Sequence, residues 1–157
     1  MKIYRSHSPE ETKKLGRDLA RRYTRSRLEK NGKNALVFAL EGDLGSGKTT
    51  FVQGFLRGLG VRRKTTSPTF IIMRRFGIKN KELRIKNIYH VDAYRIKNPR
   101  ELLALGFRAI LSDPKNIVLV EWGEKIHRIL PKSAIRVKFS HGKKENERVL
   151  TGPVGML

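Results

Sequence analysis

Residues 42–49 read GDLGSGKT, which fits the phosphate-binding pattern G-x-x-x-x-G-K-[ST] at every position. A short apolar run, residues 35–40 (ALVFAL), precedes this loop. An amphipathic stretch with apolar residues at Phe51, Val52 and Phe55 follows it. The sequence therefore predicts a buried strand, a glycine-rich turn and a helix, in the order that phosphate binding requires. We expect the protein to bind a nucleoside triphosphate.

The polar groups of this loop have distinct expected tasks. Backbone N–H groups are expected to cradle phosphate oxygens along Gly45, Ser46 and Gly47. Lys48 should bridge the β- and γ-phosphates, and the hydroxyl of Thr49 should bind Mg²⁺. Thr50 is placed to donate to the α-phosphate. Asp43 does not fit, because a carboxylate beside phosphates repels them unless it turns outward or faces the metal ion.

Buried strands and amphipathic helices alternate along the rest of the chain. The box Ser8-Pro9-Glu10-Glu11 predicts the start of a first helix that ends at residues 31–32. Further predicted elements are strands at 69–73, 88–91 and 116–120, helices at 99–105 and 125–130, and an antiparallel pair at 134–139 and 148–151. This order favours one α/β domain over residues 1–157, with a largely parallel central sheet flanked by helices and an antiparallel edge near the C-terminus.

The composition narrows the functional classes. The chain has no cysteine, which excludes disulfides, thiolate zinc sites, iron–sulfur clusters and cysteine nucleophiles. No apolar run approaches the roughly 20 residues that span a bilayer, and the start lacks a signal peptide, so we expect a cytoplasmic protein. The 35 Lys and Arg against 14 Asp and Glu give a net charge of +21. This charge favours a polyanionic partner or reflects a basic background composition, and both interpretations stay open.

Acidic residues that follow predicted strands are candidates for the metal ion and for hydrolysis. Ligands of parallel sheets lie at the carboxyl ends of the strands, where Asp92 and Glu121 are expected. Trp122 comes next and is either a core anchor or a nucleotide contact. His90 lies two residues before Asp92, on the same strand face, without partners for a metal cluster. No guanine-reading Asn/Thr-Lys-x-Asp segment occurs, so ATP is the expected nucleotide.

Five segments in this order resemble the bacterial TsaE (YjeE) ATPases over nearly the whole chain. They are GDLGSGKTT (42–50), SPTF (67–70), HVDAYR (90–95), the stretch with Pro99, Glu101, Leu102 and LGF (105–107), and VEW (120–122). The resemblance implies a P-loop ATPase that acts in making threonylcarbamoyladenosine in tRNA. It also implies two partner proteins, TsaD, which transfers the threonylcarbamoyl group to tRNA, and TsaB. ATP hydrolysis would then reset the assembly.

The same resemblance implies roles for individual residues. Glu121 would hold Mg²⁺ together with Thr49, and Asp92 would support the metal ion or the attacking water. Further matched positions are Ser67 and Thr69, in a switch-like loop over the γ-phosphate, and Thr12, near the nucleotide base. The catalytic set is then Lys48, Asp92 and Glu121. Asp43 matches a regular position of the family's loop.

Two alternatives to an ATPase subunit remain open. A small-molecule kinase would use the basic stretch 74–86 as a lid, although no acceptor site is evident. A nucleotide-gated RNA-binding module would bind RNA without turnover, and the stretch 61–86, with nine Lys or Arg and one acid, suits it. Hydrolysis by the chain alone should be slow, because no obvious arginine finger occurs. Arg95 is either that finger or a structural ion-pair partner.

Overall fold

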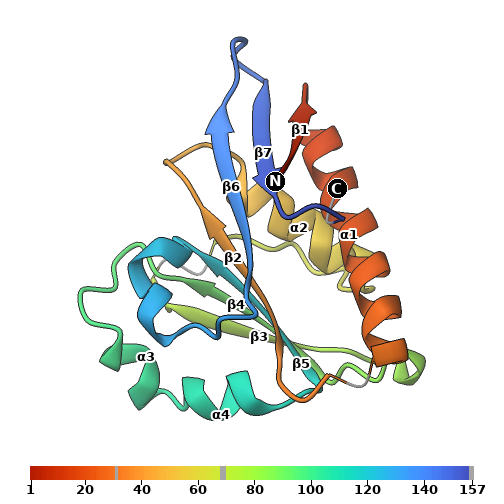
Figure 1. The fold of residues 1–157 in the computed structure, drawn as a ribbon, viewed down its shortest axis with the longest axis vertical. Helices are drawn as coiled ribbons and strands as arrows, with labels where there is room; N and C mark the ends of the chain where they lie inside the picture. The colour runs from red at the N-terminus through yellow and green to blue at the C-terminus, as the bar shows by residue number, and fades with distance from the viewer. Residues whose placement is uncertain (31, 68–69, 156–157) are drawn as a thin grey trace.

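The computed structural model describes residues 1–30, 32–67 and 70–155 of the chain. One seven-stranded sheet, in the order β1-β7-β6-β2-β5-β4-β3, carries helices on both faces (Figure 1). The strands are β1 (Lys2–Ser6), β2 (Leu36–Glu41), β3 (Met73–Gly77), β4 (Asn87–Asp92), β5 (Asn116–Glu121), β6 (Ile135–His141) and β7 (Arg148–Gly152). The helices are α1 (Pro9–Lys30), α2 (Lys48–Gly58), α3 (Arg100–Ala104) and α4 (Phe107–Ser112), with 3₁₀ helices η1 (Lys81–Leu83) and η2 (Gly123–Ile129).

The centre of the sheet is parallel, and both of its edges are antiparallel. Strand β2 lies between β5 and β6, parallel to both, and β4 is parallel to β5. In this register Asp92 of β4 pairs with Glu121 of β5, which pairs with Leu40 of β2. The predicted antiparallel edge near the C-terminus is confirmed by β6 and β7. The carboxyl ends of β2, β4 and β5 therefore meet at one edge of the sheet.

Two hydrophobic clusters hold the layers together. On one face of the sheet, α1 and α2 cover a cluster that includes Leu19, Phe38, Phe55 and Leu119. On the other face, α3, α4 and η2 cover a cluster that includes Val37, Leu102, Phe107, Val120 and Ile126 (Figure 1). Strands β2 and β5 contribute to both clusters through alternate residues, as expected for strands buried on both faces. None of the described helices is long and apolar enough to cross a bilayer.

Helices α1 and α2 pack unusually close because glycines lie at their contact. A Cβ on Gly54 would overlap the backbone of Lys13, and one on Gly16 would overlap the carbonyl of Phe51. A Cβ on Gly58 would lie 2.9 Å from the Cβ of Ala20. This close approach brings the first turns of both helices to the same edge of the sheet.

The predicted start of α1 is confirmed in detail. The hydroxyl of Ser8 accepts a hydrogen bond from the N–H of Glu11 at 3.2 Å. The Glu11 carboxylate accepts in turn from the N–H of His7 at 2.7 Å. The two side chains thus satisfy N–H groups at the beginning of the helix, as a capping box does.

The predicted strand at 69–73 is wrong, since β3 begins only at Met73. Ile72 adopts a left-handed φ of 62°, and the N–H of Met73 bonds to the carbonyl of Ile71 at 2.6 Å, so a tight turn occupies this segment. Residue 69 lies outside the described residues. Strand β3 then runs antiparallel to β4 and gives the sheet a second antiparallel edge.

Other element boundaries also differ from the prediction. Strand β1 was not predicted, because its side chains are largely exposed and it is stabilised by pairing with β7. The predicted helix 99–105 ends at Ala104, and Gly106, with a φ of 80°, separates it from α4, which was not predicted. The predicted helix 125–130 is the 3₁₀ helix η2, which begins earlier, at Gly123.

Candidate nucleotide-binding site

The glycine-rich loop lies between β2 and α2 and forms one wall of a cavity of about 300 Å³. Gly42 has a φ of 129° and approaches β6 so closely that a Cβ would overlap the carbonyl of Phe139. Gly47, with a φ of 102°, precedes α2, and no side chain caps that helix. The first N–H groups of α2 thus remain available to an anion at the helix's positive end.

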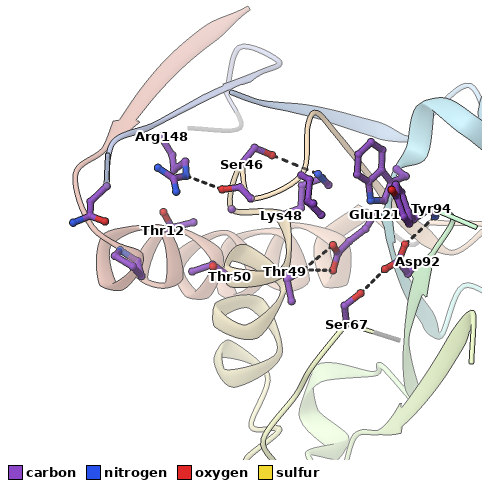
Figure 2. Close-up of a pocket in the computed structure, with 16 residues that line it drawn as sticks. Thr12, Ser46, Lys48, Thr49, Thr50, Ser67, Asp92, Tyr94, Glu121 and Arg148 are labelled. Atoms are coloured by element: carbon purple, nitrogen blue, oxygen red, sulfur yellow. Dashed lines mark hydrogen bonds between the residues drawn. The ribbon is translucent and has the colours of Figure 1, made fainter. Parts of the chain in front are cut away.

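The cavity brings together sequence-predicted residues from five segments (Figure 2). Its wall includes Thr12, Gly45, Ser46, Gly47, Lys48, Thr49, Thr50, Ser67, Asp92, Glu121 and Trp122. Of the predicted site residues, Thr69 lies outside the described residues. Residues more than 100 positions apart in the chain therefore share one cavity, because the carboxyl ends of the parallel strands meet there.

Lys48 is buried against the loop that precedes it. Its Nζ donates hydrogen bonds to the carbonyls of Gly42, at 2.6 Å, and Asp43, at 2.7 Å. The same ammonium lies 4.2 Å from the ring centroid of Trp122. Burial lowers the pKa of Lys48, and the negative charge of Glu121 opposes this shift. The Lys48 ammonium is thus held by the partial charges of two carbonyls. A phosphate oxygen could replace them, because its full negative charge binds an ammonium more strongly.

Thr49 and Glu121 form the centre of the site. The hydroxyl of Thr49 lies 2.8 Å from Oε2 and 3.0 Å from Oε1 of Glu121. His90 Nε2 lies 2.7 Å from Oε1, so this buried carboxylate is held from both sides. A hydroxyl and a carboxylate side by side are oxygen donors of the kind Mg²⁺ prefers, and they fit such an ion. The described residues contain no group of three His, Cys, Asp or Glu that could hold a metal ion, so phosphate oxygens and water would supply the remaining ligands.

Asp92 ends β4 beside Glu121 and connects two other segments to the cavity. Its Oδ1 accepts a hydrogen bond from the N–H of Tyr94 at 2.9 Å, and its Oδ2 accepts one from the hydroxyl of Ser67. The segment of Ser67 is also held to α2, because Gln53 Nε2 donates to the carbonyl of Thr65 at 2.8 Å. Asp92 thus positions the segment that borders the cavity opposite the loop (Figure 2).

Thr12 and Asp43, the two residues with uncertain roles, occupy opposite environments. Thr12 is buried in the first turns of α1, and its hydroxyl lies 2.7 Å from that of Ser6. It borders the cavity beside Gly47. Asp43 is exposed and is absent from the cavity wall, although its negative charge still acts on Lys48 and raises the pKa of that ammonium.

Trp122 lies at the border between the core and the cavity. It packs partly buried against the second hydrophobic cluster and also lines the cavity. Its φ of 60° is left-handed, a conformation that a bulky side chain rarely adopts. The ring centroids of Tyr94 and Trp122 lie 4.9 Å apart. Lys125 Nζ donates a hydrogen bond to the backbone carbonyl of Tyr94. Strain of this kind concentrates at functional sites.

No sequence pattern predicts two residues of the cavity wall, Asn146 and Arg148. Asn146 lies in the segment that joins β6 to β7, and Arg148 is the first residue of β7, about 100 positions after the loop. Arg148 Nε donates to the carbonyl of Gly45 at 3.0 Å, which ties β7 to the loop (Figure 2). Arg95 is absent from the cavity wall, and its guanidinium instead lies 4.6 Å from the ring centroid of Phe70. One arginine in a basic chain cannot be distinguished from the others by pattern alone.

Comparisons with known proteins point to one family. The family model "Threonylcarbamoyl adenosine biosynthesis protein TsaE" matches residues 6–150, a range that contains the whole cavity wall. The "tRNA threonylcarbamoyladenosine biosynthesis protein TsaE" of Haemophilus influenzae is 37% identical over 114 residues, 73% of this chain and 68% of that protein. The Bacillus subtilis protein of the same name is 32% identical over 154 residues, 97% of this chain and 85% of that protein. The crystal structure of Bacillus subtilis YdiB superposes with a TM-score of 0.70 at 29% identity, over 96% of this chain and 83% of that one.

Proposed function

This chain belongs to the TsaE family, and on that premise we propose that it binds and hydrolyses ATP as a subunit of the machinery that forms threonylcarbamoyladenosine in tRNA. Residues 1–157 would act as one ATPase domain in the cytoplasm. The observation that carries this proposal is the contact between Thr49 and Glu121 at the end of the phosphate-binding loop. This contact supports the proposal, because P-loop proteins hold Mg²⁺ with a loop hydroxyl and a carboxylate at the end of a strand.

The loop and the first turn of α2 would bind the triphosphate. N–H groups from Gly45 to Thr50 would donate to phosphate oxygens, and Lys48 would exchange its carbonyl partners for the β- and γ-phosphates. Thr49 and Glu121 would hold Mg²⁺, which supplies charge neutralisation at the β- and γ-phosphates when bound. Thr12 and Trp122 would contact the nucleoside, and Thr69 would join Ser67 near the γ-phosphate.

Hydrolysis would proceed by in-line attack of water on the γ-phosphorus. Asp92 would orient this water and accept its proton, while the bond between the γ-phosphorus and ADP breaks. Lys48 and the loop N–H groups would stabilise the charge of the transferring phosphoryl group. No arginine other than Arg148 lines the cavity in the described part of the chain, and Arg148 is bound to the loop carbonyl of Gly45. Slow hydrolysis by the chain alone is therefore expected.

The partners would be TsaD-like and TsaB-like proteins, with tRNA as the substrate of the assembly. The test measures phosphate release from ATP by the chain alone, and then with both proteins and tRNA. We expect a low rate alone and a marked increase in the assembly, with activity abolished by removal of Mg²⁺. Lys48→Ala should lose at least 100-fold of the rate, since it removes charge stabilisation at the transferring group.

Three results would contradict the proposal. An unchanged rate for Lys48→Ala in the complete assembly would show that hydrolysis occurs elsewhere. A phosphorylated product in a screen of small acceptors would instead support a kinase. RNA binding that follows the nucleotide state, without phosphate release under any condition, would support a nucleotide-gated RNA-binding module.

A further inference from the structure

Basic side chains gather on a surface that lies apart from the nucleotide cavity. Six exposed residues define what we call the basic surface: Arg21, Arg22 and Arg25 of α1, and Arg62, Arg63 and Lys79 of the loops that follow α2 and β3. None of the six lines the nucleotide cavity. Because the proposed ATPase chemistry uses none of them, their role requires a separate explanation.

Two hollows occur on the basic surface. The first, of about 520 Å³, is lined by the three α1 arginines together with Asp18 and Ser26. The second, of about 690 Å³, lies between residues 59–63 and 76–80 and has no acidic residue in its wall. Its guanidinium and ammonium groups come from Arg62, Arg63 and Lys79. Both hollows thus offer concentrated positive charge to a ligand.

The two hollows belong to the same layer of the molecule. Helices α1 and α2 pack on one face of the sheet (Figure 1). A Cβ on Gly58, at the end of α2, would lie 2.9 Å from the Cβ of Ala20 of α1. Val61 and Phe76, which line the second hollow, share a hydrophobic cluster with Ala20. The arginines of α1 and the loops after α2 and β3 are therefore held by one rigid core.

The charges of the basic surface are not neutralised within the protein. Among the described residues, the Lys and Arg side chains that form ion pairs are others, namely Arg5, Lys14 and Arg136. Arg63 lies 5.6 Å from the ring centroid of Phe76, a contact that leaves its charge unpaired. Cations at this density repel one another and raise the local concentration of polyanions.

We propose that the basic surface binds the phosphate backbone of RNA, and that the RNA is the tRNA of the proposed function. Five of its six cations are arginines, whose planar fork matches phosphate oxygens. A protein partner would need apolar anchors, which dominate the energy of protein interfaces. The large exposed apolar side chains of the described chain lie elsewhere, at Met1, Ile3, Leu44, Phe70, Ile71, Tyr94, Leu105 and Val154. The choice of tRNA rests on the proposed function, whereas RNA binding itself does not.

The test compares two variants that each remove three positive charges. Arg62→Gln/Arg63→Gln/Lys79→Gln changes the basic surface, and Lys97→Gln/Arg100→Gln/Arg108→Gln changes exposed residues in and beside α3 and α4. Binding of an unmodified tRNA transcript is measured at salt concentrations from about 0.05 to about 0.3 M, because the screening of charges strengthens over this range. The first variant should bind about 100-fold more weakly at about 0.1 M salt, and its log–log salt slope should fall by about 2 to 3.

The second variant, Lys97→Gln/Arg100→Gln/Arg108→Gln, distinguishes phosphate contacts at the basic surface from an effect of the protein's net charge. It should keep the wild-type slope to within about 1, because the lost charges do not contact phosphates. Equal losses in both variants would show that only net charge matters and would overturn the proposal. If poly-L-glutamate binds as tightly as tRNA and loses as much affinity in the first variant, the surface is assigned to an acidic protein instead. Lys48→Ala should bind tRNA normally, so a failed ATPase and a failed RNA surface give different results.

Discussion

His90 Nε2 lies 2.7 Å from Oε1 of Glu121, and both residues are buried. A carboxylate only accepts hydrogen bonds, so Nε2 carries the proton when the imidazole is neutral. No hydrogen-bond partner among the described residues reaches His90 Nδ1. The imidazole thus contacts the site only through the Glu121 carboxylate and orients it. The hydroxyl of Thr49 binds the same carboxylate from the other side.

His90→Leu should weaken Mg²⁺-dependent nucleotide binding by roughly 10- to 100-fold, the usual effect of losing a residue that orients a metal ligand. His90→Gln, which keeps an N–H donor, should recover part of this loss. Calorimetry with a non-hydrolysable ATP analogue, with and without Mg²⁺, measures both variants. Equal metal dependence in His90→Leu and the wild-type protein would show that the contact with Glu121 is only structural.

Glu121→Ala and Asp92→Ala should separate metal binding from hydrolysis. Glu121→Ala should abolish the gain in nucleotide affinity that Mg²⁺ provides, because a direct ligand is lost. Asp92→Ala should keep most of that gain and lose about 100-fold or more in rate. The matched control is Glu82→Ala, an exposed carboxylate outside the cavity wall, which should behave as wild type. Unchanged turnover in Asp92→Ala would remove that residue from the catalytic set.

Gly54→Ala should destabilise the protein by about 1–3 kcal/mol, because its Cβ would overlap the backbone of Lys13 and force α1 and α2 apart. Chemical denaturation measures this change in the free energy of unfolding. Gly77→Ala is the control, since a Cβ there meets no atom within 4 Å. The same loss in both variants would mean that helix packing is not the cause.

Glu147→Gln should lower the melting temperature at pH 7, and this effect should shrink as the pH falls below 4.5. Hydrogen bonds from the N–H of Lys144 and of Lys143 and the charge of Arg5 lower the pKa of Glu147 below its ordinary 4.5. When the pKa of a carboxyl is lower in the folded than in the unfolded protein, its ionised form stabilises the fold at a pH above the pKa of the unfolded state. This contribution disappears as the pH falls through the pKa of the folded state.

Glu145→Gln, an exposed neighbour on the same segment, should show no such pH dependence. A difference between Glu147→Gln and the wild-type protein that stays as large at pH 3 as at pH 7 would contradict the linkage. The result bears on the cavity because Glu147 directly precedes Arg148, which donates to the phosphate-binding loop.

Local pattern was sufficient for the elements around the loop. The apolar run 35–40, the glycines and the amphipathic residues after Lys48 predict β2, the turn and α2, because each feature acts over a few neighbouring residues. Asp92 and Glu121 were also predictable as neighbours, since parallel strands end at one edge of a sheet. The strand predicted at 69–73 was wrong, because the tight turn at Ile72 has no sequence signature.

By itself, the sequence determined the phosphate-binding loop, the central strands and the family to which the chain belongs. Only the tertiary structure decided that His90 holds Glu121, that Asp43 lies outside the cavity wall and that Arg148 reaches the loop from β7. It also decided which cations, among 35 Lys and Arg, gather on the basic surface. These relationships join residues up to about 100 positions apart, and they depend on strand order and helix packing, which no local pattern of residues encodes.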